Sequence, residues 1–238
     1  MNLLPTTTQE PSEHKPTLLC NDPNFAVIDN VLEPQIFTQF WEYFNTLPFQ
    51  NCSHDQWLKV WKLSDGEILR SPTFYHTKAP FNCPMDWIQN YVFWLSAKFP
   101  HLIGEYGKDW EEIQFTPYLY PDGSKISWHN DFGYTGACIF YAHPKWSAHW
   151  GGELLVAKTE DGDGEWTSEK SEETWSRNTF SRENHSDFLN KQGIGNYIVA
   201  KPNRLVFTKG SAWHSVNRVD RTAGDNVRCS VVGFFIKK

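Results

Sequence analysis

The chain has 238 residues, and its 39% hydrophobic content, with seventeen Phe, twelve Trp and nine Tyr, is enough to form one large core. Its formal net charge is −6, and residues 159–187, with nine acidic and three basic side chains, account for all of it. The rest of the chain has no basic stripe that could follow a phosphate backbone, which argues against a nucleic-acid partner.

No apolar run approaches the roughly 20 residues that cross a bilayer, so we expect no membrane segment. The amino terminus also lacks the cationic and apolar segments of a secretory signal. Five cysteines, an odd number without a C-x-x-C pair, fit reduced thiols better than disulfides or a zinc cluster. We therefore expect a cytoplasmic protein.

The first 111 residues predict a tail followed by a helical support. Residues 1–22 are polar and contain proline, as is typical of a flexible tail, and 23–238 form the single expected domain. "NFAVIDNVL" predicts a short strand. A helix is expected to begin near Pro34, with apolar residues at the spacing of one buried stripe, and a second over 84–98.

From residue 112 to the end, short β-rich runs alternate with Gly, Pro, Asn and Asp. The runs are "IQFTPYLY", "KISWHND", "ACIFYAH", "GELLVAK", "NYIVA", "RLVFTKG", "AWHSVNRV" and "VRCSVVGFFIKK". This texture predicts a mainly β fold, with a double-stranded β-helix (jelly-roll) core on which the earlier helices pack. The polar stretch 158–197 is too long for an ordinary connection, so we expect a lid or local disorder there.

"SWHNDFGY" places two metal-binding side chains, His129 and Asp131, at positions i and i+2 of a predicted strand. On a strand such residues share one face, so both can reach the same ion. Any chain with nine histidines contains such triplets by chance, and a second, in "SRENHSDFLN", has the polar surroundings of a solvated loop. His214, on a later predicted strand, would complete the two-histidine, one-carboxylate triad typical of non-haem Fe(II).

The last predicted strand, "VRCSVVGFFI", places Arg228 and Ser230 on one face. If that face lines the barrel, Arg228 is a buried cation that needs an anion. A ligand carboxylate could accept two parallel hydrogen bonds from the guanidinium, and the Ser230 hydroxyl could add a third.

Four ordered blocks, "YPDGSKISWHND", "CIFYAHPKWSAHWGGEL", "PNRLVFTKGSAWHSV" and "RCS", resemble the iron(II)- and 2-oxoglutarate-dependent dioxygenases over about residues 112–237. They are most similar to the prolyl-4-hydroxylase-like branch, which includes the hypoxia-sensing prolyl hydroxylases. The resemblance implies Fe(II), 2-oxoglutarate and O2 as cofactors, with ascorbate as a possible reductant. It also implies that His129, Asp131 and His214 hold iron, while Arg228 holds the far carboxylate of 2-oxoglutarate.

The same resemblance assigns Tyr120 to the wall of the cosubstrate pocket and Tyr141 to a hydrogen bond with 2-oxoglutarate. The connection before Arg228 is longer than usual in this branch, so Arg218 and Arg221 are alternatives for its role. Six further residues also have expected roles. Trp128 and Trp213, each next to a metal ligand, are candidates for the substrate pocket, whereas His143 and His149 are expected at the surface, and the glycines of "WGGEL" are expected to serve the backbone.

The function that follows is hydroxylation of an unactivated C–H bond in an amino-acid-like substrate, free or within a peptide or small natural product, as 2-oxoglutarate is converted to succinate and CO2. Halogenating relatives lack the carboxylate ligand, so Asp131 favours hydroxylation. Two alternatives stay open on the residues alone. They are a zinc-dependent hydrolase with the same ligands and a non-catalytic jelly-roll binding module.

Overall fold

The computed structural model describes residues 14–52, 65–76, 83–158 and 194–238. Most of the expected lid, including His185 and Asp187, and most of the expected tail lie outside the described residues.

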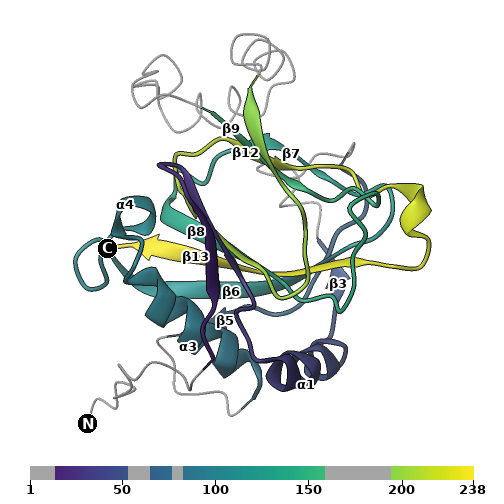
Figure 1. The fold of residues 1–238 in the computed structure, drawn as a ribbon, viewed down its shortest axis with the longest axis horizontal. Helices are drawn as coiled ribbons and strands as arrows, with labels where there is room; N and C mark the ends of the chain where they lie inside the picture. The colour runs from purple at the N-terminus through teal and green to yellow at the C-terminus, as the bar shows by residue number, and fades with distance from the viewer. Residues whose placement is uncertain (1–13, 53–64, 77–82, 159–193) are drawn as a thin grey trace.

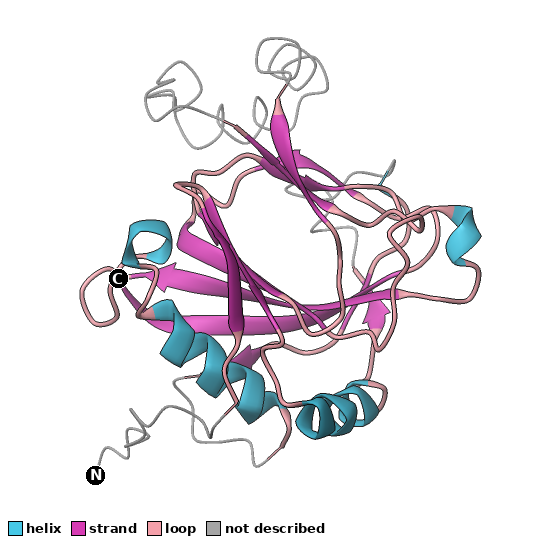
Figure 2. Cartoon of the chain, in the orientation of Figure 1, coloured by secondary structure: helices cyan, strands magenta, loops and turns pink. Residues whose placement is uncertain are grey.

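The strands form two antiparallel sheets that face each other, with helices on the far side of the larger one (Figure 1, Figure 2). The larger sheet runs β1-β2-β11-β8-β13-β6-β4-β3, and β5 also pairs with β6. Its strands are β1 (Thr17–Asn21), β2 (Phe25–Asp29), β3 (Gln50–Asn51), β4 (Leu69–Arg70), β5 (Phe74–Tyr75), β6 (Trp110–Tyr120), β8 (Tyr134–Tyr141), β11 (Leu205–Lys209) and β13 (Arg228–Lys237).

The smaller sheet runs β10-β9-β12-β7. Its strands are β7 (Ile126–His129), β9 (Leu154–Ala157), β10 (Gly195–Ile198) and β12 (His214–Val216). Strands distant in sequence therefore lie side by side, and the arrangement is the predicted jelly roll.

Period-two alternation along the larger sheet divides its side chains between two cores. On β8, Phe140 belongs to the core under the helices, whereas Ile139 and Tyr141 belong to the core between the sheets. The smaller sheet contributes Leu154 and Val156 to that second core. The layer between the sheets is therefore largely apolar, and a polar side chain within it needs a specific partner.

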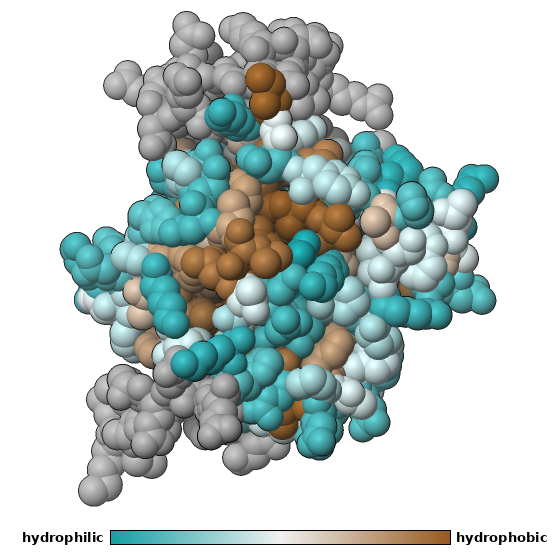
Figure 3. All heavy atoms as spheres, viewed as in Figure 1, coloured by the Kyte–Doolittle hydropathy of each residue, from teal (hydrophilic) through white to brown (hydrophobic). Residues whose placement is uncertain are grey.

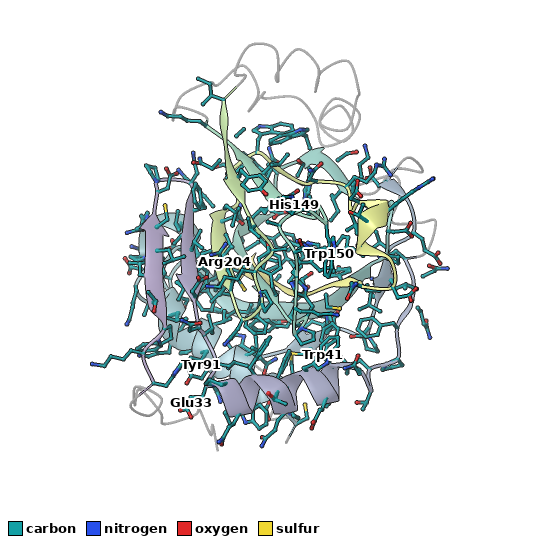
Figure 4. The ribbon with its side chains drawn as sticks, turned by 45° about the vertical axis from the view of Figure 1, so that its right-hand side comes forward. Glu33, Trp41, Tyr91, His149, Trp150 and Arg204 are labelled. Carbon is teal, nitrogen blue, oxygen red and sulfur yellow. The ribbon has the colours of Figure 1, made fainter. Side chains whose placement is uncertain are left out.

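The helices cover the outer face of the larger sheet (Figure 2). They are α1 (Pro34–Phe44), α3 (Met85–Ser96) and the short α4 (Pro100–Ile103), and a 3₁₀ turn, η2 (Arg221–Ala223), lies in the β12–β13 connection. Helix α1 begins at Pro34 as predicted and buries Phe40 and Phe44, and the ring of Phe40 meets Phe140 edge to face at 5.6 Å. Trp41, labelled in Figure 4, is half-buried against the same core.

All eight strands predicted after residue 112 are present, and so are the strand at 25–29 and both predicted helices. The tail differs from expectation, because Thr17–Asn21 forms β1 at the edge of the larger sheet. The three two-residue strands β3, β4 and β5 were also not predicted within the helical support.

No helix in the described part of the chain is long and apolar enough to span a membrane. On the face shown in Figure 3, hydrophobic residues gather near the middle, between the two sheets, with hydrophilic residues around them. The exposed large apolar side chains include Leu18 and Leu19 of β1.

Candidate active site

His129 and His214 are direct cross-strand neighbours, because β7 and β12 pair with these two residues opposite each other. Their ring centroids are 4.3 Å apart. Asp131 follows the end of β7 rather than lying on the strand, and its backbone N–H donates to the Gly210 carbonyl at 2.9 Å. The sequence therefore predicted the three residues, while a turn rather than strand alternation directs the carboxylate.

The donor atoms of these three residues converge. The Asp131 carboxylate lies 4.0 Å from Nε2 of His129 and 3.5 Å from Nε2 of His214. All three potential ligand atoms lie within 4.8 Å of one another, and among the described residues this is the one group of three or more His, Cys, Asp or Glu side chains so arranged. Both histidines are 5% exposed, so water has little access to them.

Backbone carbonyls set the tautomers of both rings. Nδ1 of His129 donates to the Ser127 carbonyl at 2.7 Å, and Nδ1 of His214 donates to the Ala212 carbonyl at 2.8 Å. Because a carbonyl only accepts, each Nδ1 carries the proton and each Nε2 keeps a lone pair. Both lone pairs are available on the side of Asp131, which is the arrangement a metal ion requires.

Burial raises the pKa of Asp131, and the neighbouring His214 only partly opposes this effect. A buried carboxylate with a raised pKa is held in the charged form by a cation beside it. Two histidines and one carboxylate match the donor set of non-haem Fe(II), so these residues fit the metal that the sequence suggested.

Arg228 is 1% exposed on β13, and no acidic side chain in the described part of the chain lies within ion-pair distance of it. Its Nε donates to the Gly152 carbonyl at 2.7 Å, and its guanidinium lies over the rings of Tyr120 and Tyr141, 4.6 and 5.0 Å from their centroids. Ser230 is close, with 3.5 Å between its Oγ and Nη1 of Arg228. The guanidinium thus keeps donors for an anion that the described residues do not supply.

Tyr141 supports the same interpretation. Its hydroxyl is buried beside the Arg228 guanidinium, which can only donate, and it has no acceptor among the described residues. Burial raises the pKa of Tyr141, while the Arg228 guanidinium opposes this effect. Tyr120 is also buried, and burial raises its pKa in the same way. An acidic ligand beside Arg228 would give the Tyr141 hydroxyl an acceptor.

Arg228 is buried, whereas its two alternatives, Arg218 and Arg221, are both exposed. Gly152, from the "WGGEL" block, was expected only to serve the backbone, but it also contacts Arg228. Its carbonyl anchors Arg228, and a Cβ at this position would lie 2.8 Å from Cδ of that side chain. The "WGGEL" block predicted a turn and a strand, but nothing in its local sequence indicates a contact with a residue 76 positions later.

The prediction for His143 was wrong. This residue is 1% exposed, donates from Nε2 to the Ala200 carbonyl at 2.7 Å and accepts the Cys229 N–H at 3.1 Å. The hydrogen bond from Cys229 therefore connects the segment after β8 to the residue next to Arg228. His149 is exposed as predicted, in the connection before β9 (Figure 4).

Trp128 and Trp213 pack together with Ala157 in a small cluster separate from the cores around the triad and Arg228. Ala157 follows Val156, which faces the space between the sheets, so strand alternation puts this cluster on the other face of the smaller sheet. Their role in a substrate pocket stays a prediction.

The sequence profile of the 2OG-Fe(II) oxygenase superfamily matches residues 113–236, the region that contains the whole constellation. The chain belongs to this superfamily. The cofactors of this oxygenase are accordingly Fe(II), 2-oxoglutarate and O2, as predicted, and it is a 2-oxoglutarate-dependent dioxygenase. A search of curated proteins by sequence found no match.

Solved structures with the same fold include a Pseudomonas putida prolyl-4-hydroxylase, 13% identical, with a TM-score of 0.55 over 90% of this chain and 93% of that one. A Trichoplax adhaerens prolyl hydroxylase, in complex with a hypoxia inducible factor peptide, is 14% identical, with a TM-score of 0.58 over 90% and 84%. HygX from Streptomyces hygroscopicus, with nickel, 2-oxoglutarate and hygromycin B bound, is 10% identical, with a TM-score of 0.53 over 90% and 83%.

Proposed function

We propose that this oxygenase hydroxylates an unactivated C–H bond of an amino-acid-like substrate, free or within a peptide or small natural product. The observation that carries the proposal is Arg228, a buried cation whose anion is missing from the described residues. A 2-oxoglutarate carboxylate supplies that anion, and the bidentate geometry of a guanidinium suits it.

Both parts of the site border the layer between the sheets. Val216, two residues after His214, shares a hydrophobic cluster with Tyr120, and Val156, opposite His214, shares one with Tyr141. These two tyrosines are the ones that flank Arg228. A five-carbon dicarboxylate with one end at the triad and the other at Arg228 would lie in this apolar layer.

In the proposed reaction His129, Asp131 and His214 hold the iron, and Arg228 with the Tyr141 hydroxyl holds the far carboxylate of 2-oxoglutarate. The bound iron supplies the oxidising chemistry, coupled to decarboxylation of 2-oxoglutarate to succinate and CO2. The protein orients the cosubstrate, directs the Nδ1 proton of each histidine to a backbone carbonyl and excludes water from the reacting centre.

The substrate class rests on the resemblance of four sequence blocks to the prolyl-hydroxylase branch. Structural neighbours support a substrate that is either peptidyl or small, because one holds a peptide and another holds hygromycin B. A zinc hydrolase or a non-catalytic binding module with the same three ligands would leave Arg228 unexplained.

Succinate release tests the proposal. Purified protein with Fe(II), ascorbate and 2-oxoglutarate should release succinate, and Asp131→Ala should reduce the rate to background because it removes one of the three ligands. His149→Ala, which removes an exposed imidazole, is the matched control and should keep the wild-type rate. Succinate release from the Asp131→Ala protein at the wild-type rate would contradict the proposal.

Substrate identity is a second measurement on the same protein. Candidate amino acids, peptides and small natural products are added without O2 to protein loaded with Fe(II) and 2-oxoglutarate. A true substrate should shift the absorption band of the iron–2-oxoglutarate complex and, once O2 is admitted, raise the rate of succinate release. If only molecules unrelated to amino acids did so, the proposed substrate class would be wrong.

A further inference from the structure

Strand β7 contains an irregularity next to His129. His129 pairs with His214 and Ile126 pairs with Val216, so three residue steps on β7 oppose two steps on β12. The extra residue on β7 is a β-bulge, a feature that redirects side chains and is common next to active sites. It allows Ile126, which packs in the core with Val216, and His129 to face the same side.

Asp65 holds the bulge in place from a distant part of the chain. Its Oδ1 accepts from the Ser127 hydroxyl at 2.6 Å, and its Oδ2 accepts from the Ser127 backbone N–H at 3.3 Å. Its own carbonyl accepts from the Lys125 N–H at 2.8 Å. Asp65 is 0% exposed, and the Lys125 ammonium lies 3.8 Å from Oδ1. A fully buried carboxylate with these bonds fixes the position of residue Ser127 strongly.

Ser127 is the residue whose carbonyl accepts the Nδ1 proton of His129 at 2.7 Å. Ser127 therefore connects Asp65, which accepts from its N–H and hydroxyl, to a proposed metal ligand, which donates to its carbonyl. Groups that orient a ligating histidine fix its tautomer and ring plane, and their loss weakens metal binding. We infer that Asp65 is a positioning residue for His129, an inference that rests on the proposed metal site.

The two histidines differ in this respect. His214 donates to the Ala212 carbonyl, and Ala212 is held by a local turn bond from its N–H to the Lys209 carbonyl. His129 instead depends on a side chain 64 residues before it, which lies outside the matched region 113–236. A segment before the family's core thus completes one ligand of that core.

Metal affinity distinguishes positioning from mere stabilisation. Co(II) replaces Fe(II) as the probe, and its dissociation constant and visible absorption spectrum are measured well below the melting temperature of each variant. Asp65→Asn replaces one acceptor oxygen with a donor group, and Ser127→Ala removes the hydroxyl. Each should raise the Kd for Co(II) about tenfold, at the lower end of the effect of an outer partner of a ligand.

Two controls complete the design. Ser127→Thr keeps a hydroxyl on the same peptide and should keep the wild-type Kd. Asp29→Asn alters another buried carboxylate, one that pairs with Arg204 and Lys201, so it should lower the melting temperature without changing the Kd.

Each outcome has one meaning. If wild-type protein does not bind Co(II), the proposed metal site fails and the inference fails with it. If wild-type binds Co(II) but Asp65→Asn and Ser127→Ala leave the Kd and spectrum unchanged, the inference alone is wrong. If Asp29→Asn raises the Kd for Co(II) as much as Asp65→Asn does, Asp65 only stabilises the fold and does not position His129. Ser127→Ala decides the question if Asp65→Asn does not fold.

Discussion

Replacing Arg228 with Met separates the stability of the protein from its affinity for 2-oxoglutarate. The guanidinium is buried without an acidic partner in the described residues, so the fold bears an uncompensated charge while no cosubstrate is bound. Met retains much of the side-chain volume and removes the charge. The substitution leaves one buried acceptor, the Gly152 carbonyl, without its donor.

The magnitude follows from the contacts of Arg228. Burying an unpaired ion costs several kcal/mol even after relaxation. The charge-assisted hydrogen bond to Gly152 returns about 1.5–3 kcal/mol, and the two ring contacts about 1–2 kcal/mol each when desolvated. These terms nearly cancel, so Arg228→Met should lower the free energy of unfolding of the metal-free protein by less than about 1 kcal/mol, or raise it.

The effect on 2-oxoglutarate should be much larger, because a charge-assisted contact is lost from a desolvated site. We expect its Kd to rise at least 100-fold, or about 2.8 kcal/mol. Thermal unfolding of Co(II)-loaded protein measures both quantities. At a 2-oxoglutarate concentration of 100 times the wild-type Kd, the wild type should gain about 2.7 kcal/mol, whereas Arg228→Met should gain less than about 0.5 kcal/mol.

Arg204→Met is the matched control, because Arg204 is also largely buried but pairs with Asp29 at 2.7 Å. It should destabilise the metal-free protein by about 1.5–3 kcal/mol, since Asp29 loses a charged hydrogen-bond partner but keeps Lys201, and should retain the gain from 2-oxoglutarate. If Arg228→Met destabilises the protein as much as Arg204→Met, or still gains stability from 2-oxoglutarate, our assignment of Arg228 is refuted.

Three further predictions concern the surroundings of Arg228. Gly152→Ala should weaken 2-oxoglutarate binding about tenfold, measured by calorimetry, because the new Cβ would press on Cδ of Arg228. Gly107→Ala is the control, since Gly107 has a similar positive φ but open space around it, and it should leave binding unchanged. Equal weakening by both substitutions would show that backbone strain is the cause. Tyr141→Phe should leave urea stability within about 1 kcal/mol of wild type and weaken 2-oxoglutarate several-fold; an unchanged Kd would contradict the role of the hydroxyl. Burial lowers the pKa of His143 to about 4. Between pH 6.5 and 4 the unfolded state therefore binds a proton at this residue that the folded state does not bind. The free energy of unfolding should fall by about 3 kcal/mol over this range. His143→Gln should remove that part of the pH dependence in urea unfolding of metal-free protein, and an unchanged slope would show that other groups cause it.

The sequence predicted the strands after residue 112 because each one alternates or runs apolar between clear turn residues. It did not predict β1, since Leu18 and Leu19 are both exposed and the strand depends on pairing with β2. Strands β3, β4 and β5 have two residues each, which is too short for any periodic signal. Pairing with distant residues, rather than local pattern, creates these elements.

His143 was misplaced for a related reason. It stands before Pro144 in a connection, where a polar residue is usually exposed. Its burial comes from contacts with Ala200 and Cys229, 57 and 86 residues away along the chain. Local sequence carries no record of such partners, so a neutral core histidine and a surface histidine have the same appearance in a chain.

The residues of the proposed metal site could be predicted because much of their geometry is local. Each histidine donates its Nδ1 proton to the carbonyl two residues earlier, so a His in either strand finds its partner within its own segment. The rest of the site is not local. Asp65 reaches Ser127 over 62 residues and the Gly152 carbonyl reaches Arg228 over 76, and neither contact has a sequence signature. Relatives with the same His-x-Asp and distal His should therefore differ mainly in these remote supports. Changes near Asp65 should then act first on metal affinity and changes near Gly152 first on 2-oxoglutarate affinity, because Asp65 supports His129 while Gly152 supports Arg228.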